Sequence, residues 1–111
     1  MLYSKLPEYS QQEIKAMLDT HSDKTTQVLL SVGEYCKDYD VALNVILDQF
    51  CASCDDEIRA CCALSFSYLA RRFRKMDKDV ITILKKELSR NVMWQGRIQD
   101  AIDDIEVFCN I

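Results

Sequence analysis

The residues with the clearest chemical potential are two cysteines, Cys51 and Cys54, which are separated by two small residues. Two thiolates at this spacing can share a zinc ion or alternate between dithiol and disulfide. A structural zinc site needs two further ligands, and the sequence has neither a second Cys-x-x-Cys pair nor a pair of histidines. A redox motif normally opens a helix after a strand, and no strand is indicated here. We therefore expect no metal and no cofactor, and interpret the cysteines as small buried side chains or as part of a helix junction.

No other group of residues resembles a catalytic site. His21 is the single histidine, and no acid–base partner can be named for it. The chain has two glycines, Gly33 and Gly96, too few for a loop that cradles phosphates. Neither a Gly-x-Ser-x-Gly elbow nor a pair of catalytic carboxylates is found. We expect that the protein is not an enzyme.

Charge is distributed unevenly along the chain. Residues 71–90 carry a net charge of +5, whereas residues 1–70 carry −6 and residues 91–111 carry −3. The basic segment 71–90 could follow a nucleic-acid backbone, but the whole chain is acidic, with a net charge of −4. Cations at the carboxyl end of a helix also stabilise its dipole, which explains the cluster of Arg71, Arg72, Arg74 and Lys75 without a ligand.

Three aspartates form an acidic cluster near the end of the sequence. If the apolar residues of this helix are buried, Asp100, Asp103 and Asp104 fall on the opposite face. Like charges at this spacing repel by a few tenths of a kcal/mol per pair, with no benefit for folding. A solvated face is one explanation. The other is a surface for a basic partner, with Trp94 as an aromatic anchor at its edge.

Length and composition indicate one all-helical domain spanning residues 1–111. Hydrophobic residues make up 49% of the chain, and only two glycines and one proline are present. Sheets and long loops need more such turn residues, so helices with short connections are favoured. No run approaches the roughly 20 apolar residues that span a bilayer, and the first residues show no apolar core of the kind expected in a signal peptide. We expect a cytoplasmic protein with no membrane partner, whose cysteines are thiols.

Six helices are predicted from start signals and apolar stripes. The start signals are Ser10, Ser22, Asp40, Ser53, Asp77 or Asp79, and Asn91. Short connections make neighbouring helices antiparallel, which gives pairs at about 10–37, 40–74 and 78–110.

The stripes recur at a regular distance. Those of the second, fourth and sixth helices are spaced by 33 and then 40 residues, and those of the first, third and fifth by 29 and then 37 residues. This period is typical of a helix-pair repeat unit. The stripes compared are Thr25/Val28/Leu29/Val32, Ile58/Cys61/Cys62/Ser65 and Ile98/Ala101/Ile102/Ile105, and, for the other series, Ile14/Met17/Leu18, Leu43/Ile46/Leu47 and Val80/Ile83/Leu84.

Residues 56–64, with the sequence DEIRACCAL, resemble the second helix of a HEAT repeat. There, an acidic cap precedes an aliphatic residue followed by arginine, small residues and a leucine. Residues 96–102 resemble this motif less closely, because Arg97 precedes the aliphatic Ile98 instead of following it. The resemblance implies three antiparallel helix pairs stacked as a short right-handed HEAT-like solenoid. A six-helix bundle with accidental periodicity is the alternative.

Small acidic HEAT-like domains without catalytic residues are similar to bacterial immunity proteins. The resemblance implies an immunity or antitoxin protein that binds a basic toxin, such as a nuclease, and covers its active site. Complementary charge suits this role because it speeds encounter. The partner-binding residues would be Trp94, Asp100, Asp103 and Asp104. The alternative is a general helical-repeat adaptor, and nucleic-acid binding through residues 71–90 is a third hypothesis.

Overall fold

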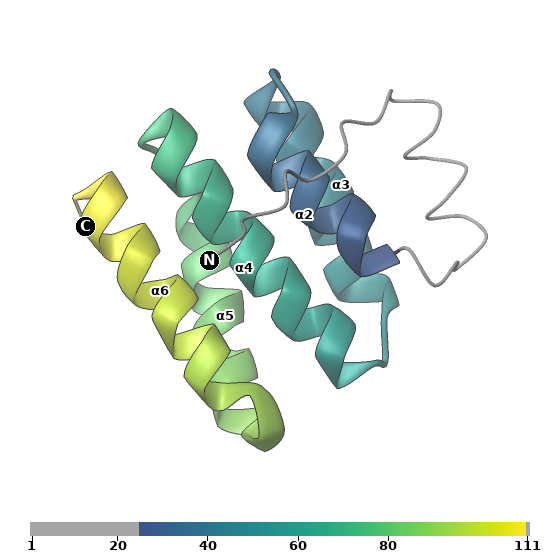
Figure 1. The fold of residues 1–111 in the computed structure, drawn as a ribbon. Helices are drawn as coiled ribbons and strands as arrows, with labels where there is room; N and C mark the ends of the chain where they lie inside the picture. Colours follow the sequence, from purple (N-terminus) through teal and green to yellow (C-terminus); the bar gives the residue numbers. More distant parts are fainter. Residues whose placement is uncertain (1–24, 111) are drawn as a thin grey trace, which may run out of the picture.

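A computed structural model describes residues 25–110 (Figure 1). The described elements are α2 (Thr25–Tyr35), α3 (Tyr39–Ala52), α4 (Asp56–Phe73), α5 (Lys78–Arg90), the short 3-10 helix η1 (Val92–Trp94) and α6 (Gln95–Cys109). The all-α prediction is confirmed for this part of the chain. The prediction of six helices is not, because the described residues form five α-helices and the helix expected from Ser10 lies outside them.

Aspartates begin α3 and α4, but not at the predicted positions. The Asp38 carboxylate accepts a hydrogen bond from the backbone N–H of Asp40 at 3.0 Å, so the predicted cap already lies inside the first turn of α3. Asp55 begins α4 in the same way, through the N–H of Glu57 at 2.9 Å, instead of Ser53. A charged carboxylate is a stronger acceptor for free N–H groups than a hydroxyl, which favours Asp55 over Ser53.

Asp77 is at the start of α5 as predicted, whereas Asn91 precedes η1 and the cap position of α6 is Trp94; neither Asp77 nor Asn91 forms a capping hydrogen bond. Asp77 precedes α5, and its carboxylate accepts from the hydroxyl of Tyr39 at 3.1 Å instead of capping the helix. Asn91 precedes η1 and makes no capping bond. Its amide is buried and donates to Glu87 and to the backbone carbonyl of Asp56. The predicted capping role of Asn91 is therefore wrong, because its side chain donates to the buried carboxylate of Glu87 instead.

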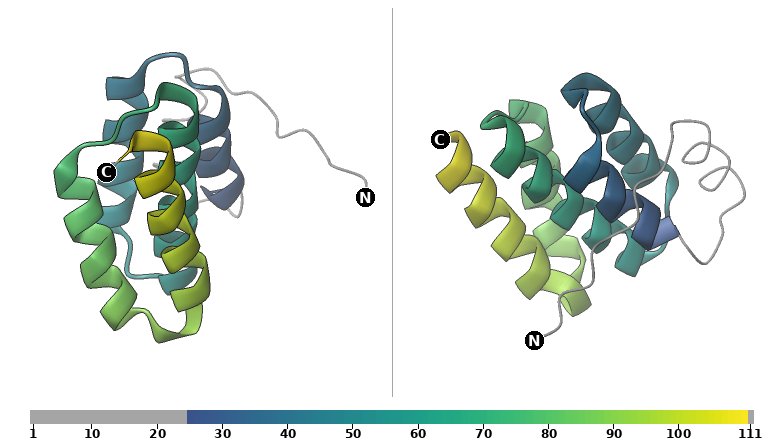
Figure 2. Two further views of the ribbon diagram at one scale, coloured as in Figure 1. Left: turned by 90° about the vertical axis from the view of Figure 1, so that its left-hand side faces the viewer. Right: turned by 45° about the horizontal axis from the view of Figure 1, so that its top comes forward.

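The helices form two layers. Helices α2, α4 and α6 lie side by side in one layer, and α3 and α5 lie behind them (Figures 1 and 2). Ser65 of α4 donates to the carbonyl of Leu29 in α2, and Arg72 of α4 donates to the carbonyl of Gly33 at 2.8 Å. Residue numbers rise together along the two helices, so α2 and α4 run parallel. Helix α3 packs on α4, and α5 packs on α6.

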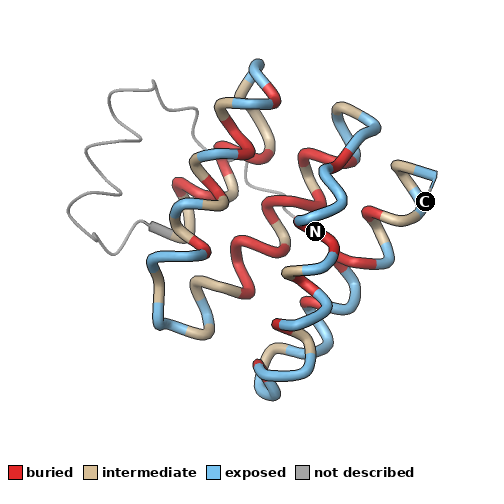
Figure 3. The backbone as a smooth tube through the Cα atoms, turned by 180° about the vertical axis from the view of Figure 1, so that it is seen from behind, coloured by how far each residue is buried: buried red, intermediate tan, exposed pale blue. Residues whose placement is uncertain are grey.

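Helix α4 is the centre of the core. It lies between α2 and α6, and most of its residues from 60 to 70 are buried (Figure 3). The predicted stripe is buried at Cys61, Cys62 and Ser65, and half-buried at Ile58. Burial also extends beyond one stripe, because α4 has neighbours on several sides. Its buried residues are Ala60, Cys61, Cys62, Ala63, Ser65, Phe66, Ser67, Leu69 and Ala70.

Gly33 marks a close approach between α2 and α4. A Cβ atom at Gly33 would lie 2.6 Å from the Oγ atom and 2.7 Å from the carbonyl oxygen of Ser65. These distances are far shorter than van der Waals contact, and the Ser65 backbone cannot swing away as a flexible side chain could. The packing of α4 on α2 therefore requires glycine at this position.

The substitution Gly33→Ala is expected to lower the free energy of unfolding by about 1–3 kcal/mol, because the added methyl group pushes α4 away from α2. Gly96→Ala is the matched control. A Cβ atom there meets no atom within 4 Å, so this variant is expected to be neutral or stabilised by up to about 1 kcal/mol. Urea unfolding measures both values. Equal stability of Gly33→Ala and the wild type would contradict the packing described for α2 and α4.

Candidate functional site

Helix α6 is the last helix of its layer, and one of its faces is exposed. The residues predicted to be buried, Ile98, Ala101, Ile102 and Ile105, are buried. Opposite them, Gly96, Asp100, Asp103 and Val107 follow one another at helical spacing, and all four are exposed. We call these four residues the outer stripe of α6. The sequence analysis placed Asp100, Asp103 and Asp104 on one solvated face, and the structure agrees for Asp100 and Asp103 but not for Asp104, which is half-buried.

Large apolar side chains are exposed at both ends of this stripe. Val107 is 73% exposed, and Val92 and Met93 of the preceding η1 are 72% and 84% exposed. Sequence analysis missed all three. The exposure of Val107 could have been predicted, since it follows Asp100 and Asp103 at helical spacing and so falls on the same face. The exposure of Val92 and Met93 could not, because they lie in a junction whose geometry is not periodic.

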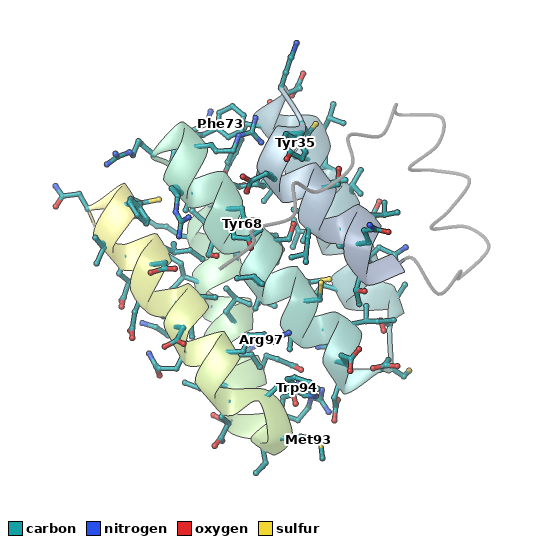
Figure 4. All side chains as sticks on the ribbon, viewed as in Figure 1. Tyr35, Tyr68, Phe73, Met93, Trp94 and Arg97 are labelled. Carbon is teal, nitrogen blue, oxygen red and sulfur yellow. The ribbon has the colours of Figure 1, made fainter. Side chains whose placement is uncertain are left out.

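The other predicted site residues lie at the edges of this surface. Trp94 is half-buried and packs partly on the core, and the Arg97 guanidinium lies 5.0 Å from the centre of its ring. Figure 4 shows Met93 and Trp94 at the amino-terminal end of α6, with Arg97 next to Trp94. Asp104 is half-buried on the side of α4, where it lies 3.8 Å from Arg71. Asp100 and Asp103 thus lie on the exposed face, whereas Asp104, one turn after Asp100, lies towards Arg71 of α4.

A buried carboxylate fixes the position of this surface. Glu87 of α5 is 2% exposed and accepts five hydrogen bonds from three side chains. Arg59 donates twice at 3.0 Å, Arg90 donates at 2.7 and 3.1 Å, and Asn91 donates at 3.0 Å. Arg90 and Asn91 directly precede η1. The bonds to Glu87 therefore determine where η1 begins and where Val92 and Met93 emerge.

The same arginine of α4 also holds the end of α3. Arg59 donates to the backbone carbonyls of Phe50 at 2.7 Å and Ser53 at 3.1 Å, and its guanidinium lies 4.1 Å from the centre of the Phe50 ring. At the start of α4, Asp56 forms an ion pair with Arg90 at 2.7 Å. The end of α3, the start of α4 and the end of α5 are therefore joined at one point.

The hydrogen bonds also set the ionisation of Glu87. Burial by itself would raise the pKa of Glu87, since it disfavours the charged form. The hydrogen bonds from Arg90, Arg59 and Asn91 outweigh burial and lower the pKa from 4.5 to about 2. Glu87 is therefore ionised at neutral pH, and it holds the network together rather than acting as a proton donor.

The cysteines fall into different environments. Cys51 and Cys54 are exposed at the junction between α3 and α4, whereas Cys61 and Cys62 are buried in α4. The interpretation of the first pair as part of a helix junction thus agrees with their position, and the burial of the second pair is confirmed. Residues 25–110 contain no group of three or more His, Cys, Asp or Glu side chains that could hold a metal ion. His21 lies outside the described residues.

The basic segment 71–90 makes many contacts within the molecule. Arg72 donates to the carbonyls of Gly33 at 2.8 Å and Cys36 at 2.6 Å, which satisfies the carboxyl end of α2. The guanidiniums of Arg71 and Arg74 lie 5.4 and 5.3 Å from the centre of the Phe108 ring. These contacts are with backbone and aromatic groups of the protein itself, and they account for much of the basic cluster without a nucleic acid.

No protein-family model, curated protein or solved structure matches this chain. The resemblance to HEAT repeats and to immunity proteins therefore rests on the residues alone and stays a prediction. In the described part of the chain, no helix is long and apolar enough to cross a membrane.

The low pKa of Glu87 predicts a pH dependence of stability. Because the folded-state pKa lies below the unfolded-state value of 4.5, the contribution of Glu87 is fully present above that pH and is lost as the pH falls towards 2. The expected loss is about 3 kcal/mol over this window. Urea unfolding at a series of pH values measures it. In Glu87→Gln this part of the dependence should be absent, and parallel curves for the two proteins would contradict the pairing of Glu87.

Thiol reactivity is expected to follow burial. Under native conditions at neutral pH, iodoacetamide should modify Cys51 and Cys54 rapidly, because both are exposed. Burial raises the pKa of Cys61 to about 12 and raises that of Cys62 as well, so these two thiols should react only after unfolding. Mass spectrometry of the alkylated peptides, with and without urea, distinguishes the two pairs. Rapid native labelling of Cys62 would show that α4 is not the buried centre of the fold.

Proposed function

We propose that this chain is a protein-binding domain and that its docking surface is η1 together with the outer stripe of α6. One observation carries the proposal. The large apolar side chains that the described fold leaves most exposed, Val92, Met93 and Val107, all lie on these two elements. Large exposed apolar side chains with polar residues among them are typical of interaction sites. Here they bracket the carboxylates of Asp100 and Asp103.

The charge of the surface indicates the chemistry of its partner. The outer stripe has two carboxylates and no lysine or arginine. A basic partner would be attracted over a distance and would associate faster than a neutral one. A second copy of this chain fits less well, because a symmetric dimer through this face would place Asp100 and Asp103 against their own copies. A basic partner protein is therefore favoured over self-association.

The most specific form of this proposal is an immunity or antitoxin protein. Nucleases that cleave nucleic acid need a basic groove for phosphates, and an acidic face with apolar ends could cover such a groove. Two features support this form: the acidic face itself and a sequence without a catalytic constellation. Neutralisation would then occur by occlusion of the active site of the toxin. A general adaptor is the alternative, and it would use the same face for a basic partner that is not toxic.

Site-specific cross-linking in the cells that make the protein tests the proposal. A photoreactive amino acid replaces Met93 or Val107 on the docking surface, or Thr82 on the exposed side of α5 as a control. We expect one basic protein to be cross-linked from positions 93 and 107 and not from position 82. If that protein stops growth when expressed alone, and co-expression of this chain restores growth, the antitoxin form is supported. A harmless partner indicates an adaptor, and labelling only from position 82 would contradict the docking surface.

Charge reversal of the docking surface should affect binding kinetics more than folding. In the double variant Asp100→Lys/Asp103→Lys, the association rate constant with the cross-linked partner should fall at least about 10-fold at low salt, with a smaller change in the dissociation rate. The free energy of unfolding should stay within about 0.5 kcal/mol of the wild type, because both side chains are exposed. Surface plasmon resonance and urea unfolding provide these values. An unchanged association rate would exclude these carboxylates from the interface.

A further inference from the structure

Gly96 has no explanation within the described fold. It lies in the first turn of α6 and is exposed, and no glycine in residues 25–110 has a positive φ. A Cβ atom at Gly96 would meet nothing within 4 Å. Glycine in a helix is less stable than alanine, because it loses more conformational freedom on folding. The sequence therefore has glycine at a helical position where the fold would accept alanine.

The other glycine of the chain shows what such a residue does in this protein. Gly33 lies where α4 packs on α2 within the same layer, and even a methyl group would collide with Ser65. One of the two glycines thus permits a close helix–helix contact. Gly96 occupies the outward face of α6, at the end of that layer, where the described chain supplies no neighbouring helix (Figure 1).

The outer stripe has the geometry that one helix presents to another. Its residues, from Gly96 to Val107, recur at intervals of three and four and extend over about 16 Å along α6. An added β-strand would need free backbone N–H and C=O groups, which the interior of a helix does not offer. A helix needs only a side-chain surface of this periodicity.

We infer that the partner contributes a helix, which packs along the outer face of α6 and comes closest to it at Gly96. The partner helix extends the α2–α4–α6 layer. Its basic side chains meet Asp100 and Asp103, and its apolar side chains cover Val107 and Met93. This inference rests on the proposed function and adds to it the form of the partner element and the point of closest contact.

A library of helical peptides provides the probe. Peptides of about 18 residues on an alanine-rich helical scaffold, with the positions of one face randomised, are displayed and selected against the wild-type protein. We expect the enriched peptides to carry lysine or arginine together with leucine or another large apolar residue. Fluorescence anisotropy then measures the affinity of the enriched peptides for the wild type and for its variants.

The variant Gly96→Leu should weaken peptide binding at least about 10-fold, because its side chain fills the place of closest approach. Gly96→Ala should have a smaller effect in the same direction. The matched control is Ser89→Leu, which adds the same side chain to the exposed side of α5 and should leave affinity unchanged. Circular dichroism should show that Gly96→Leu remains folded and is at least as stable as the wild type.

The outcomes separate the two proposals. If Asp100→Lys abolishes peptide binding but Gly96→Leu does not change it, the docking surface stands and the close approach at Gly96 is wrong. If neither change affects the enriched peptides, both the docking surface and the inference fail. If no basic helical peptide is enriched, the helical form of the partner is overturned, whereas the cross-linking result still decides the proposed function.

Discussion

The fold depends on the need to neutralise one buried carboxylate. Glu87 can be ionised inside the protein only if cations and hydrogen-bond donors reach it, since an unpaired buried charge costs several kcal/mol. Arg59 comes from α4 and Arg90 from the end of α5. The two helices must therefore be positioned so that both guanidinium groups reach the Glu87 carboxylate. Arg59 is simultaneously bound to carbonyls at the end of α3. Removal of Glu87 or of one of its donors would leave a buried charge or polar group without a partner. The stability of the network therefore depends on all of its residues.

The same constraint carries through to the docking surface. Asn91 donates both to Glu87 and to the carbonyl of Asp56, and this orientation leaves its own Oδ1 without a hydrogen-bond partner among the described residues. The reverse orientation would point that oxygen at the carboxylate of Glu87, which is worse. The side-chain amide of Asn91 is thus held by its two acceptors, the Glu87 carboxylate and the Asp56 carbonyl. This anchors the residue that directly precedes η1. Val92 and Met93 directly follow this anchored residue and are exposed.

Sequence patterns predicted what depends on periodicity and missed what depends on contacts across helices. The all-α class and the buried stripes of α4 and α6 follow from apolar spacing, and they are confirmed in the described residues. The importance of Glu87 could not be deduced in this way, although it shares a helical face with Val80 and Leu84 and is thus a carboxylate at a core position. Arg90 and Asn91 lie three and four residues after Glu87, within reach of a local helix pair, but Arg59 lies 28 residues away, and no local rule connects it to Glu87. The predicted cap at Asn91 failed because its amide is bonded to Glu87 instead.

Charge in the sequence also differs from charge that is available at the surface. Residues 71–90 are the most basic segment of the chain, yet Arg72 caps α2, and Arg90 is paired with two carboxylates. On α6 the situation is reversed, since Asp100 has no partner in the described structure and Asp103 is bonded only to the neutral amide of Gln99. The fold therefore uses much of the positive charge of residues 71–90 internally and leaves the carboxylates of Asp100 and Asp103 without a cationic partner among the described residues. The charges that the fold does not neutralise are the ones that remain free to attract a partner, and they lie beside the apolar groups that the fold does not bury.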